Sequence, residues 1–142
     1  GEIYGLEHGP MGGDELNVIK PGNNYGWPAI TYGKDYNGSI ISPFTEMKGM
    51  EQPIKYWVPS IAPSGMMLYD KELFPEWKGS IFVSSMKPGS VRRLELKENK
   101  IIQENIIFDD LSRIRDIALL PNGSILLATD GSGGEIISVQ PN

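Results

Sequence analysis

Short apolar runs alternate with turn residues through the second half of the chain. Four runs rich in Ile, Val, Leu, Phe, Met and Tyr cover residues 65–69, 80–85, 91–96 and 101–107, and Gly, Pro or Asn residues lie between successive runs. β-Branched and aromatic residues favour strands, whereas Gly, Pro and Asn favour the tight turns between strands. The pattern predicts four consecutive strands that form one antiparallel sheet.

The same pattern starts again further along the chain. Apolar runs predict three more strands, at residues 114–120, 124–129 and 135–139. Residues 73–85 and 119–130 share one arrangement, in which an apolar strand, a turn containing Gly and a second strand follow one another. This weak repeat of roughly 40–45 residues has the period of a four-stranded propeller blade. The predicted fold class is therefore all-β, a β-propeller of four-stranded antiparallel blades.

The first sixty residues are less regular. Residues 15–19 and 25–32 are candidate strands, and the polar, Gly-rich residues 33–53 are interpreted as a loop-rich insertion. We interpret residues 1–142 as one partial β-propeller domain, with no amphipathic helix.

The length of the chain limits the number of blades. Blades of ~40–50 residues give about three, whereas closed propellers have 4–8. The last repeat lacks a fourth strand, which a closed propeller would take from the opposite end of its chain. The start at Gly1 shows no targeting signal and is interpreted as a cut edge. We therefore expect either the C-terminal part of a longer protein or several copies that complete a ring.

Composition and charge exclude several classes of protein. The chain has 39% hydrophobic and 22% charged residues, a net charge of −5, no cysteine and one histidine. No apolar run approaches the ~20 residues of a membrane-spanning helix. The acidic balance argues against nucleic acid as a partner, because binding to phosphates draws on clustered Lys and Arg. Any metal ion must be held by oxygen atoms or by the single histidine.

Irregular backbone next to carboxylates makes residues 7–17 a candidate calcium site. Gly9-Pro10 and the Gly12-Gly13 pair prevent a regular strand, so some carbonyl groups stay outside a sheet. Ca²⁺ prefers several hard oxygen ligands in a flexible geometry. The alternative is a solvated turn in which Asp14 and Glu15 cap backbone amides.

Two arginines form a candidate anion site. Arg113 and Arg115 lie two residues apart on a predicted strand and therefore face the same side. Their paired donor groups suit a carboxylate or an oxyanion. The alternative is a surface pair neutralised by Asp109, Asp110 and Asp116.

Two further segments are weaker candidates for ligand contacts. Lys87 follows an apolar strand where a loop begins, although such a lysine can simply be solvated. Residues 56–65 contain two prolines and two serines in an extended segment that a flat ligand could approach, although core packing explains Trp57 equally well. No Ser-His-Asp triad, nucleophile elbow, P-loop or dinucleotide fingerprint occurs.

Taken together and in order, these segments resemble the soluble pyrroloquinoline quinone (PQQ)-dependent glucose and aldose sugar dehydrogenases, which are six-bladed quinoprotein β-propellers. The resemblance extends over nearly the whole chain. The segments that carry it are residues 7–17, 24–28, 50–53, 59–65, 73–79, 113–116 and 121–130.

The resemblance implies a set of site residues. The cofactor-binding residues would be His8, Ser60, Lys87, Arg113 and Arg115. The carbonyl groups of Gly9 and Pro10 would bind the Ca²⁺ of the cofactor, and the Glu15 carboxylate with a Tyr25 oxygen would bind a second, structural Ca²⁺. Family members often have a basic residue where this chain has Met11, which removes any salt bridge there.

The implied reaction oxidises an aldose at its anomeric carbon to the lactone, with hydride transfer to PQQ and an external electron acceptor. The family's general-base histidine would lie in an earlier blade outside this chain, so the chain alone is expected to be inactive. The resemblance also implies a periplasmic or extracellular location. Two alternatives are a non-catalytic propeller module that binds a protein or glycan and a propeller lactone hydrolase with a metal-bound water.

Overall fold

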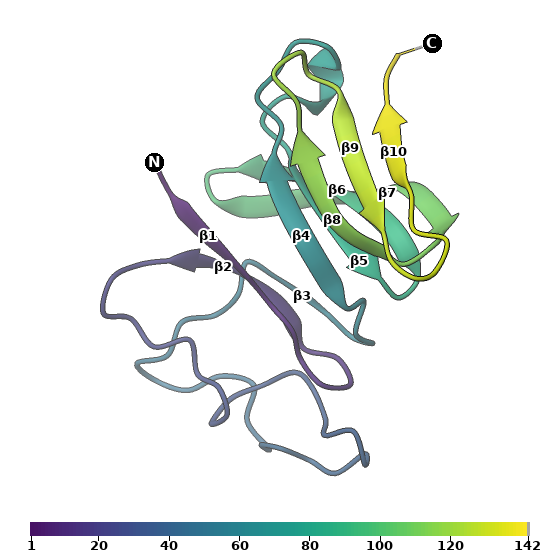
Figure 1. Cartoon of the computed structure of the whole chain (residues 1–142). Coiled ribbons are helices and arrows are strands. Elements are labelled where there is room, and N and C mark those ends of the chain that lie inside the picture. The colour runs from purple at the N-terminus through teal and green to yellow at the C-terminus, as the bar shows by residue number, and fades with distance from the viewer. Residues whose placement is uncertain (142) are drawn as a thin grey trace. The chain divides into compact units, whose positions relative to one another are not determined.

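The computed structural model describes residues 1–141 and contains two compact units, Gly1–Ala62 and a second that begins at Pro63. Figure 1 shows the antiparallel sheets of each unit. No α-helix occurs within the described residues, and none of their helical segments is long and apolar enough to cross a membrane. The prediction of an all-β fold with about three antiparallel blades is confirmed, although only one sheet within residues 1–141 has four strands.

The first unit contains one three-stranded sheet. Its strands β1 (Ile3–Glu7), β2 (Asp14–Ile19) and β3 (Lys55–Trp57) are arranged in the order β1-β2-β3. The long connection between β2 and β3 contains the residues of the predicted insertion, where an isolated bridge joins Lys34 to Ile40. Because β1 and β2 pair in the register Glu7 to Glu15, the segment between them forms a bend at one end of the sheet.

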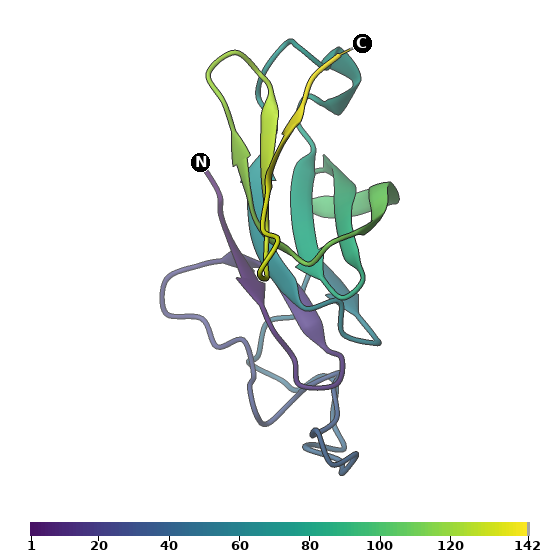
Figure 2. The same cartoon turned by 45° about the vertical axis from the view of Figure 1, so that its right-hand side comes forward.

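The second unit contains a four-stranded and a three-stranded sheet. The first sheet has the order β4-β5-β6-β7 and the second the order β10-β9-β8. Their strands are β4 (Pro63–Leu68), β5 (Ile81–Met86), β6 (Gly89–Lys97), β7 (Lys100–Leu111), β8 (Ile114–Leu119), β9 (Ile125–Thr129) and β10 (Ile136–Val139). A 3₁₀-helix, η1 (Pro75–Trp77), lies between β4 and β5. Figure 2 shows the β4–β7 sheet and the β8–β10 sheet of this unit from a second direction.

An apolar core joins the two sheets of the second unit. It contains Phe82 and Val91 from the four-stranded sheet and Ile114, Ile125 and Leu127 from the three-stranded sheet, all 0–1% exposed. Their burial removes apolar surface from water, which is the main favourable term in folding. The core therefore fixes the connections β5–β6 and β7–β8, on which the candidate cationic residues lie.

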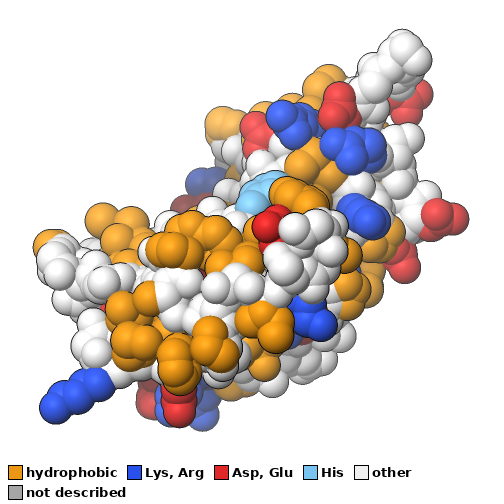
Figure 3. All heavy atoms as spheres, turned by 90° about the horizontal axis from the view of Figure 1, so that it is seen from below, with side chains coloured by type: hydrophobic (Ala, Val, Ile, Leu, Met, Phe, Trp, Pro, Cys, Tyr) orange, Lys and Arg blue, Asp and Glu red, His pale blue; other side chains and the backbone are white. Residues whose placement is uncertain are grey.

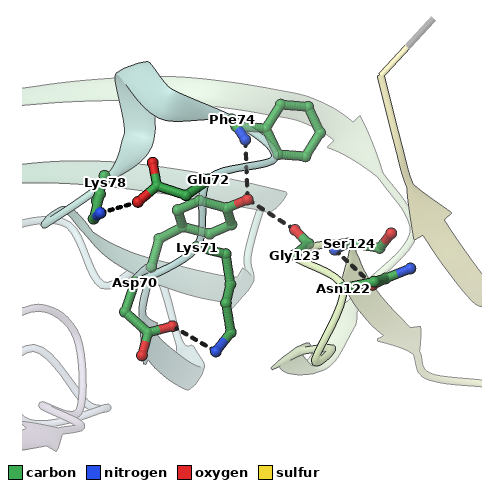
Figure 4. Close-up of polar contacts among 9 residues, drawn as sticks. Asp70, Lys71, Glu72, Phe74, Lys78, Asn122, Gly123 and Ser124 are labelled. Atoms are coloured by element: carbon green, nitrogen blue, oxygen red, sulfur yellow. Dashed lines mark hydrogen bonds and ion pairs between the residues drawn. The ribbon is translucent and has the colours of Figure 1, made fainter.

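A buried tyrosine connects this core to the turn that follows β8. The Tyr69 side chain is 0% exposed. Its hydroxyl donates to the Gly123 carbonyl at 2.9 Å and accepts from the Phe74 N–H at 3.1 Å. Figure 4 draws the two contacts as dashed lines that end on the labelled Gly123 and Phe74. Gly123 has φ +92, and a Cβ there would lie 2.6 Å from the Cβ of Leu73. The Gly turn noted in the repeat is thus required by a positive φ and by close packing.

Most of the predicted strands are present within a few residues of the expected bounds. The candidate strand at residues 25–32 is wrong, because Gly26 has φ +96 and its carbonyl accepts the Ile30 N–H in a turn. Strands β1 and β3 were not predicted. Strand β1 has Gly5 at its centre and β3 has only three residues, so neither gives a clear alternating pattern.

We expect Tyr69→Phe to lower the free energy of unfolding by about 1–3 kcal/mol, because it leaves the buried Gly123 carbonyl and Phe74 N–H without this partner. Urea denaturation measures the change. Tyr36→Phe is the matched control, since the Tyr36 side chain is 77% exposed. Equal stability of the two variants would contradict a structural role for the Tyr69 hydroxyl.

Candidate functional site

The bend between β1 and β2 is fixed by close backbone contacts within the first unit. A Cβ on Gly9 would lie 2.0 Å from the Gly12 carbonyl oxygen, so only glycine fits there. The Met11 N–H donates to the Lys34 carbonyl at 3.1 Å, and the Gly13 N–H donates to the Trp57 carbonyl at 2.8 Å. The bend therefore has a defined shape, although its sequence resembles a flexible loop.

Two carbonyl groups of this bend lie outside its hydrogen-bond pattern. None of the turn and loop hydrogen bonds found in residues 1–141 ends on the carbonyl oxygen of Gly9 or Pro10. Carbonyl oxygens without a hydrogen-bond donor are suitable ligands for Ca²⁺. His8 directly precedes them, and its side chain is exposed, as Figure 3 shows.

Asp14 follows the bend and is fully buried. Its carboxylate accepts the Gly9 N–H at 2.8 Å and the Ile61 N–H at 2.7 Å, and the Ser60 hydroxyl lies 2.8 Å from Oδ2. The sequence analysis considered Asp14 as a cap in a solvated turn. Asp14 does accept backbone amides. The expected solvation is wrong, because the Asp14 side chain is 0% exposed.

A second group of oxygen atoms surrounds Glu15. Asn17 Nδ2 donates to Glu7 Oε1 at 3.1 Å and to Glu15 Oε2 at 3.3 Å, and the buried Asn17 Oδ1 has no hydrogen-bond partner. Burial raises the pKa of Glu15, the Asn17 hydrogen bond opposes this shift, and the charge of Glu7 adds to it. A cation beside Glu15 would relieve both unfavourable effects on the carboxylate.

A cavity of about 340 Å³ lies beside this group and is lined by Glu7, His8, Glu15 and Tyr25, among others. The Tyr25 hydroxyl donates to the Val18 carbonyl at 2.9 Å and accepts the Lys20 N–H. Its backbone carbonyl is therefore the Tyr25 oxygen left for a cation. No cluster of three or more His, Asp or Glu side chains with metal-binding geometry occurs in the described part of the chain, so a cation here needs backbone or amide oxygens as well.

The two candidate arginines of the second unit contact one methionine. Lys87 lies in the turn between β5 and β6, and the arginines lie where β7 passes into β8. Arg113 Nη2 and Arg115 Nη1 donate to Met86 Sδ at 3.4 and 3.0 Å. Because Met86 directly precedes Lys87, the structure places both guanidinium groups beside the turn that carries Lys87.

The arginines are only partly neutralised. Arg113 Nε lies 3.6 Å from Asp130 Oδ2, across a pair of largely exposed side chains. In residues 1–141, neither arginine forms a salt bridge with Asp109, Asp110 or Asp116, the partners considered in the alternative interpretation. A thioether sulfur is a weak acceptor and carries no charge, so it does not compensate the charge of Arg115.

Sequence reasoning gave no separate role to three residues near these candidates, Glu7, Asn17 and Met86. It named Asp14 as a cap but did not predict its burial. The alternation of β1 and β2 could have placed Glu7 opposite Glu15, but no local signal links Asp14 to Ser60 or Met86 to the arginines.

Comparison with known proteins identifies the family. The family model described as glucose/sorbosone dehydrogenase matches residues 1–138. The chain belongs to this family. The predicted resemblance to the soluble PQQ-dependent sugar dehydrogenases is therefore confirmed at the level of the family.

Individual relatives and solved structures agree with this assignment. Aldose sugar dehydrogenase YliI of Escherichia coli K12 is 39% identical over 138 residues, which cover 95% of this chain and 37% of that protein. A solved structure of a glucose dehydrogenase has a TM-score of 0.94 and 39% identity, over 100% of this chain and 42% of that one. The PQQ-bound aldose sugar dehydrogenase of Streptomyces coelicolor has a TM-score of 0.72 and 25% identity, over 98% of this chain and 40% of that one. The chain thus spans about two fifths of these relatives.

We expect Glu7→Gln to raise the free energy of unfolding at pH 7 without metal by about 0.5 kcal/mol, because it removes a like charge directly opposite Glu15. The pKa of Glu15 is raised in the folded state, so the repulsion develops as the pH rises through that value and disappears when the carboxyl groups are protonated. Urea denaturation in EDTA at pH 7 and at about pH 3 measures the effect, with Glu2→Gln as the control. A variant less stable than the wild type at pH 7 would contradict the repulsion.

Proposed function

We propose that the chain supplies the cofactor-binding rim of a PQQ- and Ca²⁺-dependent sugar dehydrogenase, which oxidises an aldose at its anomeric carbon to a lactone. The observation that carries the proposal is the convergence of Arg113 and Arg115 on Met86, next to Lys87. Two guanidinium groups beside the turn that carries Lys87 suit a ligand with three carboxylates such as PQQ. The PQQ-bound relative supports the same cofactor.

The first unit would hold the cation of the cofactor. The carbonyl oxygens of Gly9 and Pro10 would bind Ca²⁺, with His8 and Ser60 as further contacts to the quinone. When bound, PQQ and its Ca²⁺ supply a hydride acceptor with a Lewis acid at its reacting carbonyl. The residues of this chain bind and orient the group, and Lys87, Arg113 and Arg115 would neutralise its carboxylates.

A second Ca²⁺ would bind beside Glu15 and have a structural role. The Glu15 carboxylate and the Tyr25 backbone carbonyl would supply two ligands. The raised pKa of Glu15 and the unpaired Asn17 Oδ1 support a bound cation in this cavity.

The general base of the reaction is proposed to lie outside these 142 residues. The only histidine of the chain, His8, lies on the proposed cofactor bend, so no second imidazole is left to take the proton of the sugar hydroxyl. The rest of the propeller or further copies of the chain would complete the ring, and an external acceptor would reoxidise the cofactor outside the cytoplasm. Dye-linked glucose oxidation by the purified chain at ordinary rates would contradict the proposal that the general base lies outside these residues.

We expect Arg115→Ala to weaken PQQ binding at saturating Ca²⁺ by about tenfold or more, since a charge-assisted hydrogen bond contributes about 1.5–3 kcal/mol. Titration of the purified chain with PQQ, followed by absorbance, measures the dissociation constant. Lys100→Ala is the control, because it removes a positive charge from an exposed position at the start of β7.

If Arg115→Ala binds PQQ as tightly as the wild type, the anion-site assignment is wrong. If the wild type does not bind PQQ at all, a non-catalytic binding module becomes the better description of the chain.

A further inference from the structure

A buried carboxylate links two distant segments of the first unit. Asp14 is the first residue of β2 and is 0% exposed. It accepts the Gly9 N–H at Oδ1, from the bend, and the Ile61 and Ala62 N–H groups at Oδ2, at 2.7 and 3.2 Å. Burial of a charge is costly unless hydrogen bonds compensate it. Here both oxygens are compensated by donors from segments that lie five and about fifty residues away in sequence.

The same carboxylate orients the Ser60 hydroxyl. Ser60 Oγ lies 3.0 and 2.8 Å from the two Asp14 oxygens, and the Ala62 N–H donates to Ser60 Oγ at 3.1 Å. A serine hydroxyl has one proton to donate and two lone pairs. Because its proton points to Asp14 and one lone pair accepts the Ala62 N–H, Ser60 offers a ligand only its remaining lone pair.

Backbone strain at the end of this segment is a separate sign that Asp14 imposes its geometry. Ala62 has φ +49, a left-handed conformation that side chains other than glycine rarely adopt. Such a residue persists only where its surroundings determine it. The Ala62 N–H is shared between Asp14 Oδ2 and Ser60 Oγ, so the two polar groups hold the residue in this state.

We propose that Asp14 is a positioning residue, which holds the Gly9–Pro10 bend and the Ser60 hydroxyl in the arrangement that binds the cofactor and its Ca²⁺. This inference rests on the proposed function. Asp14 itself contacts no ligand in this role, because its carboxylate is buried and its oxygens are used by Gly9, Ser60, Ile61 and Ala62. It acts through the carbonyls of the bend and through Ser60.

Asp14→Asn is the decisive variant, because it keeps the shape of the side chain and replaces one acceptor oxygen with a donor NH₂ group. At least one of the three backbone N–H groups then faces another donor. We expect amide hydrogen exchange at Gly9 or at Ile61 and Ala62 to accelerate at least about tenfold, since an N–H that loses its acceptor opens at a lower free energy. Asp70→Asn is the control, because Asp70 is exposed and forms an ion pair with its neighbour Lys71.

Binding gives the second readout. We expect the Ca²⁺ concentration for half-maximal PQQ binding to rise about tenfold or more in Asp14→Asn, from the loss of a hydrogen bond to a charged group. If Asp14 acts through Ser60, Ser60→Ala weakens binding strongly in the wild type and much less in the Asp14→Asn background, whereas independent roles give additive effects. Ser60→Thr, which keeps the hydroxyl, should retain binding.

The two readouts separate the inference from the proposed function. A wild type that does not bind PQQ overturns the proposed function, while the exchange rates still decide whether Asp14 holds the bend. A wild type that binds PQQ and an Asp14→Asn variant with unchanged exchange and unchanged Ca²⁺ dependence overturn the inference. If Asp14→Asn does not fold, full PQQ affinity in the folded Ser60→Ala variant overturns it instead.

Discussion

Two guanidinium groups share one uncharged sulfur atom at the β5–β6 turn of the second unit. Arg113 and Arg115 both donate to Met86 Sδ, and Arg113 has a carboxylate at 3.6 Å. Like charges at short range repel one another, and a thioether offers little compensation. The core of the second unit fixes the two connections, so the fold tolerates this repulsion, and a bound anion would relieve it. The proposed role in cofactor binding depends on this arrangement.

The first unit contains a buried negative charge, the carboxylate of Asp14. Its buried carboxylate is fully compensated, and the hydrogen bonds that compensate it leave the carbonyl oxygens of Gly9 and Pro10 unused. The bend is thus held by hydrogen bonds and close contacts within the first unit, and those of Asp14 are among them. A site that is shaped before the ligand arrives loses less conformational freedom on binding, which suits the proposed Ca²⁺ of a redox cofactor.

Local sequence patterns predicted much of the second unit and less of the first. Strands such as β5 and β9 are apolar runs bounded by Gly or Asn, so their signal lies within a few residues. Residues 25–32 have the aromatic composition of a strand, but the positive φ of Gly26 turns the backbone. The common face of Arg113 and Arg115 follows from strand geometry, whereas their contact with Met86 and the contact of Asp14 with Ser60 depend on tertiary packing across 27 to 46 residues.

A crystal structure of the chain with PQQ and Ca²⁺ tests the central claim most directly. The arrangement predicts a Ca²⁺ ion about 2.3–2.6 Å from the carbonyl oxygens of Gly9 and Pro10 and cofactor carboxylates hydrogen-bonded to Arg113 and Arg115 in place of Met86. A cofactor bound elsewhere, with both guanidinium groups still on the methionine sulfur, would contradict it.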